Sequence, residues 1–204
     1  YEGGRPAMPT KQASTRNKFG QEKLCFDRVA SAALLSALMS DSQAKLLDSC
    51  RLSKGAKFSW ELTRAIGAPY WVRSDKLLVK VAEEIAQTVY KSTKDVMDCA
   101  LFYVAMRNMT KLKAIAATDR SDQGKKFLKF IMDNDFTSNR GRQTAEKNAY
   151  SLLRKRKYSS AACFFLLAEP PMIKTALDVI KSQLQDPSLA FFVARLVEGA
   201  PKKS

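Results

Sequence analysis

The chain has 204 residues, 46% of them hydrophobic and 27% charged, which is enough for one domain with a core or for a stack of small helical units. Histidine is absent, and this excludes a Ser-His-Asp or Cys-His nucleophile system, a zinc site with histidine ligands and an imidazole proton shuttle. The net charge of +15 is compatible with nucleic acid, anionic lipid or an acidic protein as partner, and equally with lysines that only keep a helical array soluble.

Composition divides the chain into three segments. Residues 1–20 carry glycine, proline, serine, threonine and basic residues without a hydrophobic period, and we expect a flexible basic arm or linker there. Residues 21–199 carry helical patterns and are expected to form a single helical domain, followed by an open tail over residues 200–204. The chain starts at Tyr1, so we interpret it as a fragment or a processed product, and its longest apolar stretch, 161–168, is too short to span a bilayer.

Long stretches poor in glycine and proline and rich in alanine, leucine and lysine predict an all-α fold. The predicted helices cover residues 22–38, 42–52, 59–67, 75–90, 95–108, 110–118, 122–133, 143–157, 158–169, 172–185 and 188–199. Ser59 is a predicted N-cap and Gly67 a predicted C-cap of the helix between them. Residues 68–72 are expected to form a packed connector, and residues 134–142 a loop.

Three of the predicted helices contain an aromatic pair beside small residues: Phe102–Tyr103, Phe164–Phe165 and Phe191–Phe192. The pairs lie 62 residues apart (102 to 164) and 27 residues apart (164 to 191), and the shorter spacing holds a helix, a turn and a second helix. In each such unit the apolar helix would pack between its own partner and the next unit. We therefore expect an irregular α-solenoid-like stack of helical hairpins; the alternative is one irregular helical domain with three buried helices.

No catalytic or nucleotide-binding motif occurs in the sequence, which has neither a glycine-rich phosphate loop nor a GxGxxG element. The paired acids Glu83–Glu84 and Asp133–Asp135 are interpreted as solvated carboxylates rather than as an acid/base pair or a metal site. We expect no enzyme activity, no cofactor, no metal site and no small-molecule substrate. A helical enzyme that uses a lysine or cysteine of perturbed pKa stays open as an alternative.

The four cysteines, Cys25, Cys50, Cys99 and Cys163, lie far apart in the sequence and form no CxxC pair. Cys99 and Cys163 fall inside apolar helical patterns, where a reduced cysteine behaves as a small hydrophobic residue. We expect buried, reduced thiols in a cytosolic protein, with a disulfide or a reactive thiol as the alternative.

Basic residues are concentrated between positions 140 and 157: Arg140, Arg142, Lys147, Arg154, Lys155, Arg156 and Lys157. On a helix, Lys147, Arg154 and Lys155 share much of one face. We predict that the seven residues form a contact surface for an acidic partner; the alternative is a solvated outer face whose last four residues compensate the helix dipole. A helical-repeat nucleic-acid-binding module is the alternative function, but Tyr150 and Tyr158 are the only aromatic residues among these cations, so no nucleic acid is expected.

The string AEKNAYSLLRKRKYSSAACFFLLAE, followed by ALDVI and QLQDPSLAFFVARLVEG, resembles the conserved helical region of the RAVE large subunit, a family that includes the DmX-like proteins, or rabconnectin alpha subunit. Upstream, YWVRSDKLLVKVAEEIAQTVYKSTKDVMDCALFYVAMRN and FLKFIMDNDF resemble it in the same order, so that the resemblance covers residues 60–199. The chain departs from the family at Gly141, where we expect a bulky aromatic residue, and at Pro170–Pro171, where we expect a polar turn.

The resemblance implies a scaffold and not an enzyme. Members of the family are large proteins with WD-repeat propellers followed by a long helical region, and they promote association of the cytosolic sector of the vacuolar proton pump with its membrane sector. It implies, as partners, peripheral subunits of the V-type ATPase and other subunits of a RAVE-like complex. The implied location is cytoplasmic, peripherally associated with vacuolar or endosomal membranes through the pump.

Overall fold

The computed structural model describes residues 38–40, 43–52 and 55–200 of the chain. These residues form α-helices joined by turns, with no β-strand among them, which confirms the all-α prediction. The helices are α2 (Ala44–Ser49), α3 (Trp60–Ala65), α4 (Ala68–Trp71), α5 (Asp75–Thr93), α6 (Val96–Ala105), α7 (Met109–Thr118), α8 (Asp122–Asp133), α9 (Asn139–Arg154), α10 (Tyr158–Leu167), α11 (Ile173–Ser182) and α12 (Pro187–Gly199). Some predictions fall outside the described part of the chain. These are the arm over residues 1–20, residues 22–37 of the helix predicted over residues 22–38, and residues 201–204 of the tail.

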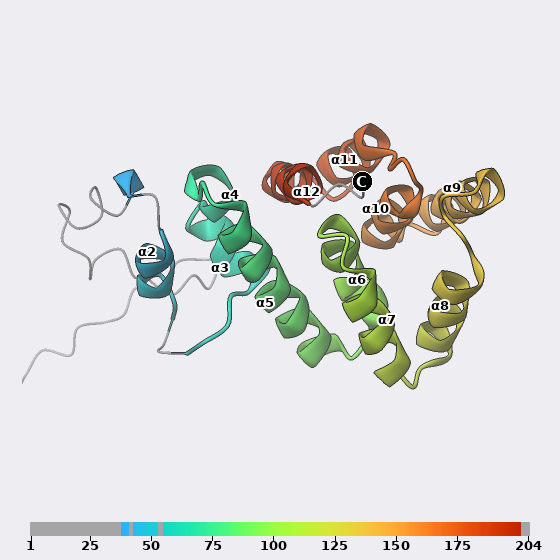
Figure 1. Ribbon diagram of the computed structural model, residues 1–204, viewed down its shortest axis with the longest axis horizontal. Coiled ribbons are helices and arrows are strands. Elements are labelled where there is room, and N and C mark those ends of the chain that lie inside the picture. The colour runs from blue at the N-terminus through green and yellow to red at the C-terminus, as the bar shows by residue number, and fades with distance from the viewer. Residues whose placement is uncertain (1–37, 41–42, 53–54, 201–204) are drawn as a thin grey trace, which may run out of the picture.

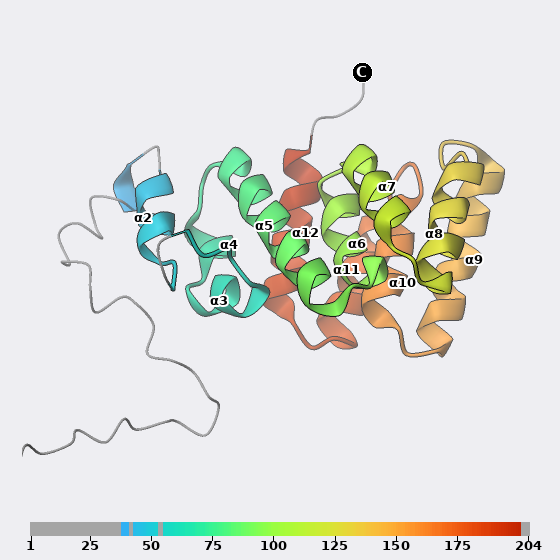
Figure 2. The ribbon, with the colours of Figure 1, turned by 90° about the horizontal axis from the view of Figure 1, so that it is seen from below.

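The helices lie in two layers, and the chain runs out along one layer and returns along the other (Figure 1, Figure 2). α5 to α8 follow one another in the first layer, and α9 to α12 return along the second. From α5 to α8 and again from α9 to α12, consecutive helices pack on each other, as the predicted stack of hairpins requires. Across the layers, α10 packs on α6, and α12 packs on α4, α5 and α6. The last described helix therefore lies beside helices from the first half of the chain.

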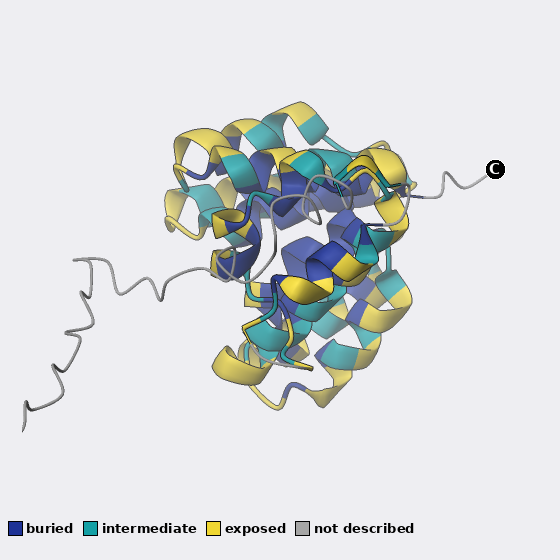
Figure 3. Cartoon of the chain, turned by 90° about the vertical axis from the view of Figure 1, so that its left-hand side faces the viewer, coloured by how far each residue is buried: buried dark blue, intermediate teal, exposed yellow. Residues whose placement is uncertain are grey.

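The hydrophobic core occupies the space between the two layers, with the exposed residues on the outer sides (Figure 3). α6 and α10 are buried on nearly all sides; in α10 every residue from Ser160 to Leu167 is buried. A helix that is apolar all round is stable in water only when neighbours cover each of its faces. The predicted burial of the helix over residues 158–169 is thus confirmed. No helix among the described residues has the length and the apolar character to cross a bilayer.

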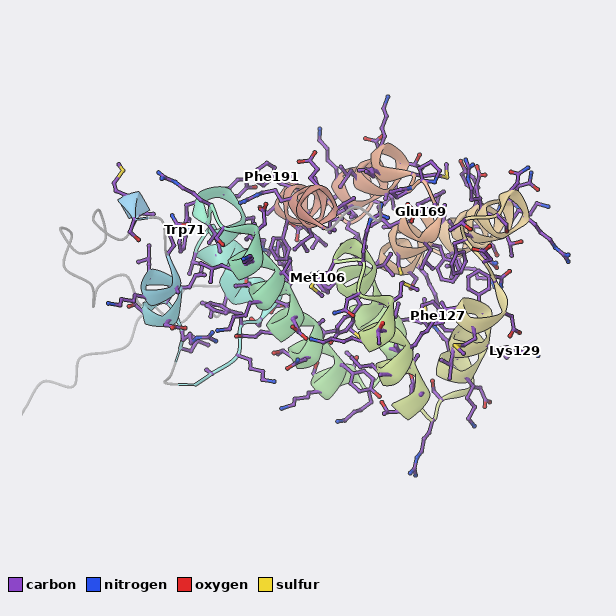
Figure 4. The ribbon with its side chains drawn as sticks, in the orientation of Figure 1. Trp71, Met106, Phe127, Lys129, Glu169 and Phe191 are labelled. Atoms are coloured by element: carbon purple, nitrogen blue, oxygen red, sulfur yellow. The ribbon has the colours of Figure 1, made fainter. Side chains whose placement is uncertain are left out.

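The three repeated aromatic pairs lie on α6, α10 and α12, but they are not equivalent. Both members of the first two pairs are buried, and so is Phe192. Phe191 is 43% exposed and stacks on Tyr70 of α4, with ring centroids 5.1 Å apart (Figure 4). The third copy therefore lies at the edge of the stack, where one face of α12 has no further layer above it.

Four of the connections between helices share one turn geometry. In each, a residue other than glycine has left-handed backbone and is followed directly by the N-cap of the next helix: Lys94–Asp95, Arg107–Asn108, Arg156–Lys157 and Gln185–Asp186. The turns after α6 and α9 match in their main-chain hydrogen bonds as well. This turn, rather than glycine, is the recurring unit that reverses the chain direction.

Side chains of α12 hold the N-terminal helices in place. The guanidinium of Arg195 donates to the main-chain carbonyl of Pro69, within the four-residue helix α4, at 3.0 Å, and also to that of Val72, its C-cap. It pairs with Asp75, in the first turn of α5, at 3.2 Å. Carbonyls at the end of a helix have no partner within that helix, so Arg195 supplies the missing donors for α4.

Ser59 is confirmed as the N-cap of α3, since it accepts a hydrogen bond from the Leu62 N–H at 3.2 Å. The predicted C-cap Gly67 is wrong by one residue: Ile66 is the C-cap of α3, and Gly67, with left-handed backbone and φ of 65°, is the N-cap of α4.

The predicted loop over residues 134–142 is wrong in its second half, because α9 begins at Asn139. The reason is the N-cap Ser138, whose hydroxyl accepts a hydrogen bond from the Gly141 N–H at 3.0 Å. The turn before α9 also passes close to position 141, where a Cβ would lie 1.9 Å from the main-chain oxygen of Asp135. The bulky aromatic residue that we expected at position 141 cannot fit this turn.

Candidate functional site

All seven basic residues predicted to form a contact surface lie on α9 and on the turn that leads to α10, and all seven side chains are exposed. Arg140 and Arg142 lie in the first turns of α9, Lys147 lies in its middle and Arg154 ends it. The other three form the turn itself. We call these seven residues the basic surface: Arg140, Arg142, Lys147, Arg154, Lys155, Arg156 and Lys157.

The sequence of α9 explains why this surface faces outward. Small residues at positions 141, 145 and 149 are buried and let α9 pack closely on α10. Arg140, Lys147 and Arg154 are spaced by seven residues, and residues at that spacing drift by only about 20° around a helix. They therefore form one stripe on the outer side of α9, whereas Arg142 points away from it. The structure thus brings together a triad that differs from the predicted set of Lys147, Arg154 and Lys155.

None of the seven cations of the basic surface forms an ion pair with a described residue. Within the described part of the chain, the side chains of the basic surface form one hydrogen bond, of 3.3 Å, from Lys157 Nζ to Gln123 Oε1 of α8. Elsewhere in the described part, basic side chains do pair with acids: Arg51, Arg64, Arg107, Lys111 and Arg195. The basic surface is therefore a local excess of positive charge that the fold itself does not compensate.

Helix stability explains only part of this charge. Arg154 and the three residues after it lie at the C-terminal end of α9, where cations interact favourably with the helix dipole. Arg140 and Arg142 lie at the opposite end, where a positive charge is unfavourable, and the first turn of α9 holds no acid. Dipole compensation therefore accounts for the C-terminal cations but not for the two arginines at the start.

Lysines of α8 extend the positive charge at this end of the molecule, and the sequence reasoning did not include them. Lys125, Lys126 and Lys129 are exposed, and Lys129 projects from the outer side of α8 while Phe127 points inward (Figure 4). Phe127 packs at a tilt against Phe164 of α10, with ring centroids 5.8 Å apart, and this contact fixes the buried face of α8. The signal was present in the stretch KKFLK, where lysines flank the buried aromatic residue.

Aromatic side chains contribute little to the basic surface. Tyr150 is 46% exposed, but its ring packs edge-on against Phe165, with centroids 5.2 Å apart. Tyr158 is half-buried. A surface that stacks unpaired bases uses several exposed aromatic faces along a basic groove. The basic surface lacks that arrangement among the described residues.

The interpretation of Glu83 and Glu84 as solvated carboxylates is wrong. Glu83 pairs with Lys111 of α7, and Glu84 accepts hydrogen bonds from Arg51 at 2.7 and 3.0 Å and from the Phe58 N–H at 3.2 Å. Burial alone would raise the pKa of Glu84, but the hydrogen bonds from Arg51 and Phe58 outweigh it and hold the pKa below its usual range. Both acids are therefore part of the contacts between helices.

Asp133 and Asp135, the other pair of acids noted in the sequence, lie at the junction between α8 and α9. Asp133 ends α8, and Asp135 accepts hydrogen bonds from the backbone and the hydroxyl of Thr137. Among the described residues, no three acids or cysteines are grouped so as to hold a metal ion.

Cys99 and Cys163 are buried free thiols, and burial raises the pKa of Cys99 to about 12 and also raises that of Cys163. Neither is a thiolate at neutral pH.

Comparison with known proteins identifies relatives along most of the chain. The family described as RAVE protein 1 C terminal matches residues 7–204. DmX-like protein 1 of Mus musculus is 36% identical over 146 residues, which are 72% of this chain and 5% of that protein. Regulator of V-ATPase in vacuolar membrane protein 1 of Saccharomyces cerevisiae is 37% identical over 145 residues, 69% of this chain and 10% of that protein. The protein of the same name in Schizosaccharomyces pombe is 27% identical over 165 residues. The chain thus spans at most 12% of the length of these relatives.

Proposed function

Because the chain belongs to the RAVE protein 1 C-terminal family, we propose that it is a non-catalytic scaffold segment that promotes reversible assembly of the V-type proton ATPase through protein–protein contacts. Two of its relatives are named regulators of V-ATPase in the vacuolar membrane. The partners in this proposal are peripheral, cytosolic subunits of the pump and other subunits of a RAVE-like complex. The location is cytoplasmic, at the surface of vacuolar or endosomal membranes.

The observation that carries the proposal is the uncompensated charge of the basic surface on a rigid helix. Seven exposed cations without an acidic partner among the described residues are suited to an acidic face of another protein. α9 is fixed by its packing on α10, so the stripe of Arg140, Lys147 and Arg154 is presented in a defined geometry, about 21 Å long. Charge complementarity of this kind sets the rate of association and the choice of partner.

The test is a charge reversal on the stripe in the full-length protein. Arg140→Glu, Lys147→Glu and Arg154→Glu together should reduce recovery of peripheral V-ATPase subunits at least tenfold in an affinity purification. The matched control reverses three exposed lysines of α5 and α11, Lys76, Lys174 and Lys181, with the same change in net charge. Unchanged recovery with the stripe variant, at an unchanged melting temperature, would show that the basic surface is not the contact.

The same seven cations favour one alternative, a helical-repeat module that binds nucleic acid. That function predicts an affinity for RNA or DNA that falls steeply with salt, because binding releases counterions from the phosphates. The scaffold function predicts only weak attraction to polyanions, with no effect of nuclease treatment on the recovery of pump subunits. Co-purification of ribosomal or chromatin components in a salt-sensitive manner, without pump subunits, would favour the alternative.

A further inference from the structure

A groove of about 480 Å³ lies between α5 and α7, two helices of the first layer. The two helices form its walls, and Tyr103 of α6, which packs on both of them, lies at its floor. The lining is mostly apolar, with Tyr90 on one wall and Ala114 and Ile115 on the other. None of the basic surface lines this groove, so it is a separate feature of the fold.

Two contacts tie α5 to α7 across this groove and fix their relative position. Glu83 pairs with Lys111, and the hydroxyl of Tyr90 is hydrogen-bonded to that of Thr118 at 2.9 Å. The two contacts are seven residues apart on each helix, so α5 and α7 run parallel with a constant offset of 28 positions (83 to 111, 90 to 118). Seven residues correspond to two helical turns, or about 10 Å. The groove is therefore a preformed slot with a defined length.

The floor of the groove presents the hydroxyl of Tyr103 to solvent. Tyr103 as a whole is only 1% exposed, and its hydroxyl forms no hydrogen bond with a described residue. Because no buried side-chain oxygen among the described residues lacks a partner, this hydroxyl is the part of Tyr103 that is open to solvent in the groove. Burial raises the pKa of Tyr103 to about 12, so the hydroxyl keeps its proton at neutral pH and can donate a hydrogen bond. A ligand that covers the groove would take this hydroxyl out of solvent, and an acceptor on the ligand would supply the hydrogen bond that it would otherwise lack.

The charges at the rim do not cancel. Glu83 is already paired with Lys111, and the ammonium group of the exposed Lys91 forms no ion pair in the described part of the chain. The groove therefore has one positive charge to be matched by a ligand. It is also open to solvent along its length, whereas a small-molecule site buries most of its ligand. The parallel helices α5 and α7, together with α6 on which both pack, correspond to three helices of a four-helix bundle. The groove between α5 and α7 lies where the fourth helix would pack.

We propose that the groove between α5 and α7 receives an amphipathic helix of a partner protein, which inserts an aliphatic or aromatic side chain over Tyr103 and pairs a carboxylate with Lys91. The apolar anchor lies between Tyr90 and Ile115, and the hydroxyl of Tyr103 donates to a polar atom of the incoming helix. This docking site does not depend on the function of the basic surface, and a partner bound here can be different from one bound there.

The test places a photo-crosslinking residue, p-benzoylphenylalanine, at Ala114 of the full-length protein and maps the crosslinked peptide by mass spectrometry. Ala117 is the matched control, because it is also an exposed alanine of α7 but does not line the groove. We expect a crosslink from position 114 to one segment of a partner protein whose sequence has helical periodicity. That segment should contain an apolar anchor residue and, within one or two helical turns of the anchor, an acidic residue. The yield at position 117 should be at least fivefold lower.

Charge reversal at the rim then tests the predicted pairing. Lys91→Glu should lower the yield at position 114 at least fivefold, whereas the control Lys129→Glu on α8 should leave it unchanged. Four results would overturn the proposal: equal crosslinking at the two alanines, no crosslink at either, crosslinking to lipid or nucleic acid, or a yield that is insensitive to Lys91→Glu. An unchanged melting temperature of both variants shows that the effects are local.

Discussion

The indole Nε1–H of Trp60 donates a hydrogen bond of 2.8 Å to Oδ2 of Asp186, across 126 positions of the chain. Asp186 is at the same time the N-cap of α12, because its Oδ1 accepts a hydrogen bond from the Leu189 N–H at 2.9 Å. The ring of Trp60 also stacks on Phe192, with centroids 5.6 Å apart. One carboxylate thus starts the last helix and joins it to α3.

Replacing Trp60 by phenylalanine removes the donor and keeps an aromatic ring. We expect the free energy of unfolding to fall by about 2 kcal/mol, because the lost hydrogen bond has a charged acceptor that is largely buried. The matched control is Tyr70→Phe, which removes the exposed hydrogen bond to Ser188 between α4 and α12 and should change stability by less than about 0.5 kcal/mol. Urea unfolding measures both changes. Equal losses of unfolding free energy would mean that the buried hydrogen bond to Asp186 contributes no more than the exposed one to Ser188.

Gly141→Ala should lower the free energy of unfolding by about 3 kcal/mol, because the added Cβ would lie 1.9 Å from a main-chain atom that cannot rotate away. Gly199→Ala is the control: its Cβ would meet the side chain of Asp75 at 2.9 Å, which is 56% exposed and can move. The gain in helix propensity offsets that contact, so the control should stay within about 1 kcal/mol of the wild type. Similar losses at both positions would refute this account.

Lys94→Gly should raise the free energy of unfolding by about 1 kcal/mol. Lys94 has φ of 58°, in the left-handed region that costs a residue with a Cβ about 1–2 kcal/mol and that glycine adopts freely. The matched control, Lys129→Gly, places glycine within α8 and should lower stability by about 1 kcal/mol. Thermal unfolding of the two variants checks the opposite signs, and a loss at position 94 would contradict the prediction.

Glu84 should make stability depend on pH. Its pKa is lowered in the folded state, so its contribution is present above the pKa of the unfolded chain and is lost as pH falls through the folded pKa. Glu84→Gln should therefore be less stable than the wild type at pH 7, and the difference should shrink as pH falls below the ordinary glutamate range, about 4.5. Urea unfolding between pH 7 and 3 measures this. The control, Glu61→Gln at an exposed site, should cost less stability at pH 7 than Glu84→Gln. A difference at Glu84 that is constant with pH would disprove the pairing.

Cys99 and Cys163 should resist iodoacetamide at pH 8 in the native protein, since burial raises the pKa of both thiols and blocks access. Peptide mapping after labelling, with a urea-unfolded sample as control, gives the modified fraction at each position. Rapid native labelling of either cysteine would revive the alternative of an enzyme that uses a reactive thiol.

Local structure was predictable where one segment carries its own signal. The periodicity of residues 75–90 and the N-cap Ser59 determine helix positions without reference to the rest of the chain. The nearly all-apolar composition of residues 158–169 predicted the burial of α10 correctly. The basic surface was predicted as a cluster because its residues are close in sequence.

Relations between distant segments were not predictable from such signals. Nothing in the pattern of Phe191 distinguishes it from Phe164, yet one is exposed and the other buried, because only the return of the chain decides which helix receives a neighbour. Glu84 has the sequence pattern of a surface acid, and its pairing with Arg51 depends on where α2 lies. The groove at Tyr103 depends on the parallel offset of α5 and α7, which no single segment encodes.

The contacts of Arg195 have a consequence for synthesis on the ribosome. The ribosome synthesises Pro69, Val72 and Asp75 more than one hundred residues before Arg195 (75 to 195). Until Arg195 is synthesised, the carbonyls of α4 lack their hydrogen-bond donors. Contacts of such long separation close late, because the entropy of the intervening chain must be lost first. A nascent chain interrupted before residue 187 would leave Trp60 and the α4 carbonyls exposed, and it would be a target for chaperones and proteases.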